Sequence, residues 1–172
     1  LIGSMMYMNP TRNTAIQRDN LEKYGKKIPI IFCSDIIHGA RTMFPIPLGE
    51  ACSWNFDLAY ESARIAAKEG SDLGVRWTFA PMVDLVRDSR WGRNMEGSGE
   101  DPYLSEEFAK ARVKGFQGDS TTIDNNHVAS TIKHFACYGL VESGKEYNRV
   151  SLSKTDLIET LRPYKAGVEA GT

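Results

Sequence analysis

The sequence predicts a parallel α/β fold, because short apolar segments typical of buried strands alternate with segments typical of helices. The alternation repeats about four times along the 172 residues. It fits either an open, doubly wound sheet or part of a (β/α)₈ barrel, since a complete barrel takes about 250 residues. No repeat of about 20–50 residues and no Ser/Gly/Pro-rich linker divides the chain, so we expect a single unit.

Two strand–helix units are predicted in the N-terminal half. Residues 2–6 are expected to end a first strand, and residues 15–24 to form the helix after it. The apolar run 28–33, bounded by polar residues, predicts a strand that is buried on both faces. The next helix is expected to begin after Asn55, whose side chain can cap it, and its apolar residues recur every three or four positions as far as Gly74.

A third unit follows. Residues 75–83 predict a strand, and the helix after it is expected to start at Ser105 and to end at Gly118. The fourth unit consists of a strand at 128–135 and a helix that Ser153 begins. Because proline lacks the backbone N–H of a helix interior, Pro163 is expected to kink or interrupt this last helix.

Composition excludes several classes of protein. The chain is 41% hydrophobic and 25% charged, which is ordinary for a globular domain. Its 21 basic and 22 acidic residues give a net charge of −1, which favours neither a nucleic acid nor an anionic membrane as partner. No apolar run is long enough to span a bilayer. Cys33, Cys52 and Cys137 are too few and too widely spaced for a disulfide framework or a zinc site, so we expect reduced thiols.

Polar side chains follow the predicted strands at the points where they end. Asp35 comes just after the strand at 28–33, and an arginine-rich segment at 87–93 follows the next one. Lys133 and His134 lie at the end of the strand after that. Because the carboxyl ends of parallel strands meet at one face, we expect these groups to converge there.

Each of these groups also has a structural interpretation. Asp35 is at a position where a turn residue or helix cap is common, and segment 87–93 can be a loop held by its own Arg–carboxylate pairs with Trp91 as anchor. Lys133 and His134 favour function more strongly, because consecutive polar side chains in an apolar strand place one of them on a buried face.

The chemistry of this set suits a polyhydroxylated ligand. Carboxylates accept hydrogen bonds from hydroxyls, whereas Arg and Lys only donate, so together they can bind neighbouring hydroxyls of a sugar ring. Phosphate is the rival ligand, but neither GxxxxGK[ST] nor GxGxxG occurs, and Asp35 would repel an anion. A metal site built from Asp35, His38 and His134 matches no standard spacing. The GxSxG motif of serine hydrolases is absent, and Cys137 is interpreted as a packed thiol.

With these residues considered, the sequence resembles glycoside hydrolase family 3, most closely its bacterial β-glucosidase branch. The resemblance rests on seven stretches whose order and spacing fit and which span nearly the whole chain: IPIIFCSDIIHG (28–39), RTMFPIP (41–47), APMVD (80–84), RDSRWGR (87–93), GED (99–101), KHF (133–135) and GKEYN (144–148). The branch that acts on N-acetylglucosaminides carries a further histidine loop after KHF, and no such histidine occurs here. This favours a glucosidase or a xylosidase.

The resemblance implies a catalytic (β/α)₈ TIM barrel, a retaining β-glycosidase, and no metal or organic cofactor. The positions that match family residues holding the non-reducing sugar are Asp35, Arg93, Lys133 and His134, and Glu146 is expected to line the same pocket. Arg87 and Asp88 match the scaffold of the arginine loop.

In the family, the nucleophile is an Asp in a later Ser–Asp motif and the acid/base is a Glu in a following domain. We therefore expect both beyond residue 172, and residues 1–172 to form a partial N-terminal barrel domain of about four βα units that is inactive alone. The rest of the barrel and an α/β domain would complete the parent protein, which is expected in the periplasm or outside the cell, with the cytoplasm as alternative. The rival interpretations are a non-catalytic sugar-binding module and an α/β enzyme that acts on a phosphorylated substrate.

Overall fold

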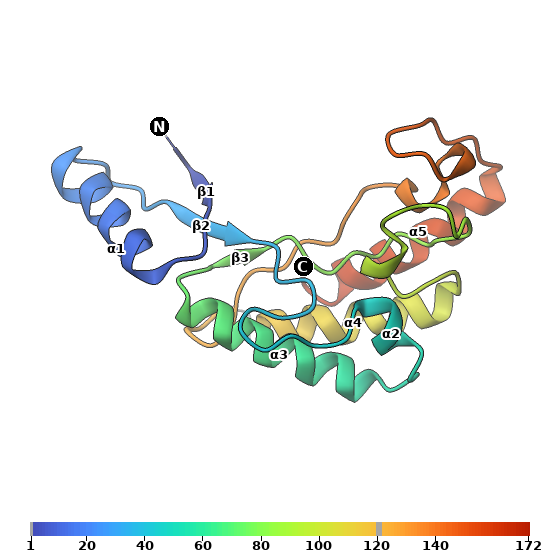
Figure 1. The fold of residues 1–172 in the computed structure, drawn as a ribbon, viewed down its shortest axis with the longest axis horizontal. Coiled ribbons are helices and arrows are strands. Elements are labelled where there is room, and N and C mark those ends of the chain that lie inside the picture. Colours follow the sequence, from blue (N-terminus) through green and yellow to red (C-terminus); the bar gives the residue numbers. More distant parts are fainter. Residues whose placement is uncertain (1, 120–121) are drawn as a thin grey trace.

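A computed structural model describes residues 2–119 and 122–172, and its centre is a short parallel sheet (Figure 1). Strands β1 (Ser4–Met6), β2 (Ile31–Ser34) and β3 (Trp77–Thr78) lie in the order β1-β2-β3, and both neighbouring pairs are parallel. A helix follows each strand before the next one begins. The predicted α/β class, part of a parallel barrel, is confirmed.

The strands predicted at 75–83 and 128–135 are wrong as continuous strands. Only β3 is formed in the first, and the second is joined to the sheet by isolated parallel bridges. These bridges pair Trp77 with Ala129 and Met82 with Lys133. The two segments still run side by side in the predicted direction. Pro81 lies between the bridges and has no N–H to donate, which explains why no regular ladder forms there.

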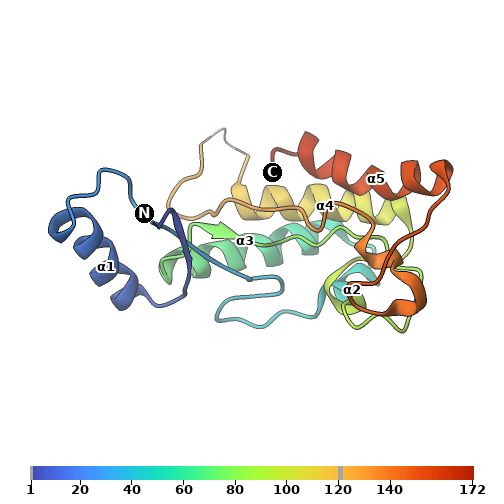
Figure 2. The ribbon, with the colours of Figure 1, turned by 90° about the horizontal axis from the view of Figure 1, so that it is seen from above.

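Three long helices lie side by side along one side of the sheet (Figures 1 and 2). They are α3 (Phe56–Asp72), α4 (Pro102–Gln117) and α5 (Lys154–Glu169). Helices α3 and α4 approach closely at Gly115, where an added Cβ would lie 2.4 Å from the carbonyl oxygen of Tyr60. This close contact fixes the position of α4 against α3.

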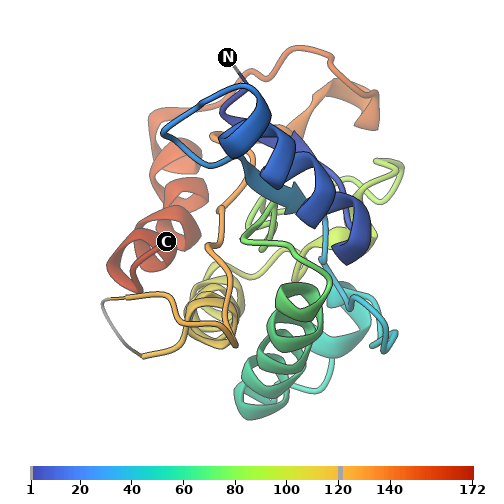
Figure 3. The ribbon, with the colours of Figure 1, turned by 90° about the vertical axis from the view of Figure 1, so that its left-hand side faces the viewer.

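The remaining helices are shorter. Helix α1 (Pro10–Arg18) continues into a π-helical turn (Asp19–Lys23) at the end of the molecule opposite α5 (Figures 1 and 3). It begins earlier than the predicted range 15–24, because Asn9 caps it and Pro10 occupies its first turn. The others are α2 (Pro47–Ala51) and three 3₁₀ turns, Asn94–Glu96, Tyr138–Leu140 and Glu142–Gly144.

Two predicted helix starts are confirmed and one is wrong. Asn55 and Ser153 accept hydrogen bonds from the first-turn N–H groups of α3 and α5. Helix α4, however, is capped by Asp101, which accepts from the N–H of Leu104 at 2.7 Å. Ser105 is buried inside this helix, where its hydroxyl is hydrogen-bonded to another serine. The competing cap wins because Pro102 is suited to the first position of a helix.

Pro163 was expected to kink or interrupt the last helix, but α5 continues through it without a break.

The core beneath the sheet is apolar and includes Ile36, Val75, Phe116 and Val128. All three cysteines are free thiols; Cys52 is exposed and the other two are buried. Within the described ranges, no helix has the length and apolar character needed to cross a membrane.

Candidate functional site

Asp35 and Lys133, which are far apart in the sequence, are in direct contact in the structure. Asp35 follows the end of β2, and Lys133 lies on the segment that runs parallel to the chain after β3. The Lys133 Nζ atom donates to the Asp35 Oδ1 atom at 2.8 Å. Lys133 is buried, whereas the Asp35 side chain is 44% exposed and therefore open to a ligand.

Glu96 extends this pair to the arginine loop. Arg93 binds the Glu96 carboxylate with two parallel hydrogen bonds, both of 2.7 Å. The Lys133 Nζ atom lies 3.7 Å from Glu96 Oε2, one of the two oxygens that Arg93 binds. The charges therefore alternate from Asp35 through Lys133 and Glu96 to Arg93, which offsets the cost of burying Lys133 and of partly burying Glu96 and Arg93. We call these four residues the charge cluster.

His134 is held by Asp84, a carboxylate that is 1% exposed. The Nδ1 atom of His134 lies 2.9 Å from Asp84 Oδ2, and the backbone N–H of His134 donates to the same oxygen at 2.8 Å. A carboxylate only accepts hydrogen bonds, so Nδ1 carries a proton and Nε2 is left for other contacts.

The hydroxyl of Tyr164 on α5 also donates to Asp84, at 2.5 Å. Burial and the Asp84 charge raise the pKa of Tyr164, so its hydroxyl stays a neutral donor. Asp84 therefore holds both the backbone and the ring of His134, and Tyr164 supports Asp84 from the side of α5.

Tyr138 links His134 to the charge cluster. Its ring lies edge-on to the His134 ring at 5.1 Å between centroids, and the Arg93 guanidinium is 5.8 Å from its centre. The hydroxyl of Tyr138 donates to Glu146. Loss of solvation, followed by the hydrogen bond to Glu146, raises the pKa of Tyr138 to about 12. Glu146 thus reaches the site through this tyrosine.

Sequence reasoning assigned neither Tyr138 nor Glu96 to the site. The spacing of three residues between Arg93 and Glu96 was a usable signal, because such residues face each other on a helical turn. Tyr138 had no comparable signal. Its place depends on the path of the chain after His134.

The rest of the arginine loop has the structural role that was considered for it. Arg87 pairs with Asp156 of α5 at 3.1 Å, and Arg90 pairs with Asp88 at 2.6 Å. The hydrogen bonds from Arg90 lower the pKa of Asp88 to about 2. Trp91 is buried beneath the loop. Of the arginines in segment 87–93, Arg93 is the one that enters the charge cluster.

The metal alternative finds no support in the geometry. His38 is held by the carbonyl oxygen of Phe44, 3.1 Å from its Nδ1 atom. In the part of the chain that the structure describes, no three His, Cys, Asp or Glu side chains are grouped so that they could hold a metal ion.

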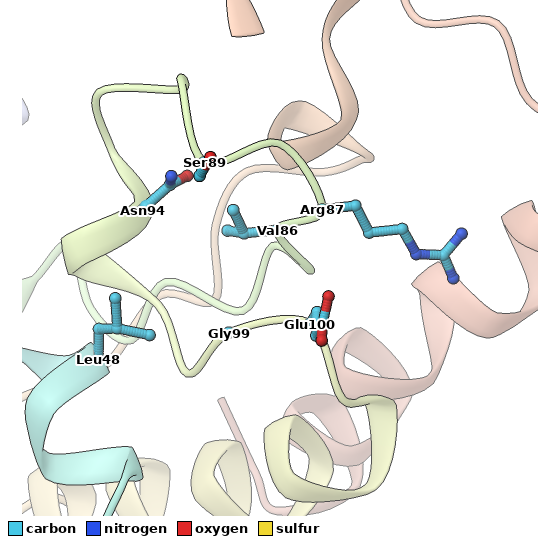
Figure 4. Close-up of a pocket in the computed structure, with 7 residues that line it drawn as sticks. All are labelled: Leu48, Val86, Arg87, Ser89, Asn94, Gly99 and Glu100. Atoms are coloured by element: carbon cyan, nitrogen blue, oxygen red, sulfur yellow. The ribbon is translucent and has the colours of Figure 1, made fainter.

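A pocket of about 230 Å³ lies beside the arginine loop (Figure 4). Its lining comes from α2, the arginine loop and the turn before α4: Leu48, Val86, Arg87, Ser89, Asn94, Gly99 and Glu100. The side chain of Arg87 extends toward α5, where Asp156 binds it (Figure 4). None of the predicted site residues lines this pocket, and we therefore distinguish it from the candidate site.

The coupling of Glu96 to its cations predicts a pH effect on stability. Burial tends to raise the pKa of Glu96, but the hydrogen bonds from Arg93 and the charges of Arg93, Lys133 and His134 lower it overall. A lowered pKa in the folded state gives stability that is present above the unfolded value of about 4.5 and is lost as the pH falls through the folded one. We expect Glu96→Gln to lower the thermal unfolding midpoint at pH 7 and to have little effect at pH 3.

The matched control is Glu107→Gln, which removes an ion pair with Lys110 on the surface of α4. Its unfolding midpoint should stay close to that of the unmodified protein at both pH values, because exposed pairs contribute little. An equal loss for Glu96→Gln at pH 7 and pH 3 would contradict the ionic origin of its effect.

Parallel strand–helix units with polar residues at the strand ends define this molecule as a partial α/β barrel. Residues 3–172 match the model of the glycosyl hydrolase family 3 N-terminal domain. The chain belongs to glycosyl hydrolase family 3.

Relatives with known names agree with this family. The chain is 49% identical over 147 residues to a periplasmic β-glucosidase of Salmonella typhimurium, which covers 85% of this chain and 19% of that protein. It is 34% identical over 153 residues to a β-xylosidase of Formosa agariphila, covering 87% of this chain and 21% of the other. It therefore spans about a fifth of the length of these relatives.

A solved structure shows the same fold. The crystal structure of a β-glucosidase from Listeria innocua in complex with glucose is 42% identical and superposes with a TM-score of 0.95. The match covers 98% of this chain and 24% of that one.

Proposed function

We propose that this chain is the sugar-binding part of a longer retaining β-glycosidase that releases terminal β-D-glucosyl residues from the non-reducing end. Family membership and the names of the relatives support the β-glycosidase activity. The observation that carries the proposal is the charge cluster, in which an open carboxylate, a buried lysine and a half-buried arginine meet at the ends of parallel strands.

Each residue has a defined part in holding the sugar. Asp35 accepts hydrogen bonds from ring hydroxyls, Lys133 and Arg93 donate to them, and the Nε2 atom of His134 faces the same ligand. Glu146 takes part through the hydrogen bond that its carboxylate accepts from Tyr138. Neighbouring hydroxyls of a glucosyl ring each donate and accept, so a set that combines both capacities binds them in one orientation.

The reacting groups themselves are proposed to lie beyond residue 172. Retention requires a nucleophilic carboxylate and a carboxylic acid about 5–5.5 Å apart, and the acid needs a raised pKa. Glu96 has a lowered pKa, because the hydrogen bonds from Arg93 and the neighbouring positive charges outweigh the effect of burial. Asp35 forms an ion pair with the Lys133 ammonium, which binds one of its oxygens. Both carboxylates are therefore suited to binding, and the much greater length of the relatives provides room for the catalytic pair.

This division of labour predicts that the 172-residue chain alone does not hydrolyse an aryl β-D-glucoside, whereas the full-length protein does. Release of the aryl group is followed by absorbance, and NMR identifies the first anomer of glucose. We expect the β-anomer from the full-length protein, as retention requires.

Turnover by the isolated chain would refute the placement of the catalytic groups, and initial release of the α-anomer would refute retention. Saturable glucose binding by a full-length protein that hydrolyses nothing would indicate the alternative of a non-catalytic sugar-binding module.

We also propose a glucoside rather than a xyloside as substrate, and the periplasm as the compartment of the whole protein. Both are supported by the 49% identity to the periplasmic β-glucosidase, against 34% to the β-xylosidase. Comparing kcat/KM for aryl β-D-glucoside and aryl β-D-xyloside tests the first, and fractionation of the producing cells tests the second.

A further inference from the structure

Tyr147 presents its aromatic ring to solvent next to the candidate site. Its side chain is among the most open in the described structure, with 89% of the residue exposed. Its backbone φ is 58°, a left-handed value that a bulky side chain rarely adopts. Within the part of the chain that the structure describes, this exposed ring in a disfavoured backbone conformation contributes little to the core.

The loop that carries Tyr147 is closed by hydrogen bonds from the two residues that follow it to Glu142. Arg149 binds the Glu142 carboxylate at 2.9 Å, and the side chain of Asn148 donates to the carbonyl oxygen of Glu142 at 3.0 Å. The loop also lies directly against the arginine loop, because an added Cβ at Gly144 would lie 2.8 Å from the backbone nitrogen of Trp91. The two loops lie side by side at the upper right of Figure 1. Tyr147 is thus presented in a fixed position.

Aromatic contacts connect Tyr147 with the site. Its ring lies 5.9 Å from that of Tyr138, at 34° between the planes. Tyr138 in turn contacts His134 and Arg93, which belong to the proposed sugar site. Tyr147 is therefore one ring further out than the groups proposed to hold the terminal sugar, on the side that is open to solvent.

We propose that Tyr147 is a stacking platform for the part of the substrate that leaves, a second pyranose ring or an aryl group. This inference rests on the proposed function, since it extends the same site outward from the terminal sugar. One face of a pyranose presents C–H groups that pack on an aromatic ring, and the tyrosine hydroxyl can bond to a sugar hydroxyl. The residue then sets the preference for the leaving group without touching the terminal sugar.

The test uses Tyr147→Ala and Tyr147→Phe in the full-length protein. Two substrates share the terminal glucosyl ring: a β-linked glucose disaccharide and methyl β-D-glucoside, whose leaving group is too small to stack. We expect the alanine variant to lose about fivefold to tenfold in kcat/KM on the disaccharide and less than about twofold on the methyl glucoside. The phenylalanine variant keeps the ring and should stay within about twofold on both.

Tyr24→Ala is the matched control, because Tyr24 is also exposed, at 62%, and follows the π-helical turn at the opposite end of the molecule. It should leave both substrates unaffected. An equal loss on both substrates for Tyr147→Ala, or no loss on either, would overturn the proposal. Failure of the unmodified protein to hydrolyse both substrates would instead overturn the proposed function, so the two failures are distinct.

Discussion

Replacing the buried Asp84 with alanine is expected to destabilise the protein by roughly 3–5 kcal/mol, since each partly buried donor that loses this partner costs about 1–3 kcal/mol. The Asp84 carboxylate accepts from the backbone N–H groups of His134 at 2.8 Å and of Tyr138 at 3.1 Å. The same carboxylate accepts hydrogen bonds from the His134 ring nitrogen Nδ1 and from the Tyr164 hydroxyl. Tyr164 retains a second acceptor in the His134 carbonyl, but the two N–H groups have no other partner nearby in the described structure.

Urea unfolding of the full-length protein and hydrogen exchange of a peptide spanning residues 131–140 together measure this effect. Asp101→Ala is the matched control, because it removes a single cap hydrogen bond of α4 and should cost about 1 kcal/mol. Asp84→Ala should accelerate exchange in the 131–140 peptide, and the control should not. Equal urea midpoints for the two variants would show that Asp84 contributes no more stability than the single cap hydrogen bond of Asp101, which would contradict the prediction.

The class of fold could be predicted from the sequence because hydrophobic runs and caps are local signals. Asn55 and Ser153 begin α3 and α5 as expected. Ser105 was a wrong cap because Asp101 and Pro102 form an equally local and better start four residues earlier. The strand at 128–135 could not be assigned correctly, because the bridges that replace it depend on Pro81 in a neighbouring segment.

The residues of the candidate site also fall into those that a local rule could predict and those that it could not. The convergence of Asp35 and Lys133 followed from the rule that parallel strands end at one face, and the structure places them 2.8 Å apart. The link through Glu96 and the ring of Tyr138 depends on how two loops pack on each other, which no local pattern encodes. Sequence reasoning therefore found the residues at the strand ends and missed those that connect them.

Lys133→Met is expected to reduce kcat/KM of the full-length protein for an aryl β-D-glucoside by about 100-fold. The methionine has a similar length and no charge. A hydrogen bond from a charged donor contributes roughly 1.5–3 kcal/mol, and each 1.4 kcal/mol corresponds to a factor of about ten. The variant also leaves Asp35 and Glu96 without the cation between them, and their mutual repulsion disturbs the positions of both.

Lys110→Met provides the matched control, since Lys110 forms an exposed ion pair with Glu107 on α4. Its kcat/KM should remain within about twofold of the unmodified value. Circular dichroism establishes that both variants remain folded, and inhibition by glucose reports directly on binding of the terminal sugar. If Lys133→Met keeps its affinity for glucose while kcat falls, the lysine acts on the reaction rather than on binding. If kcat/KM stays within twofold, Lys133 does not contact the substrate, and the buried ion pair with Asp35 is structural only.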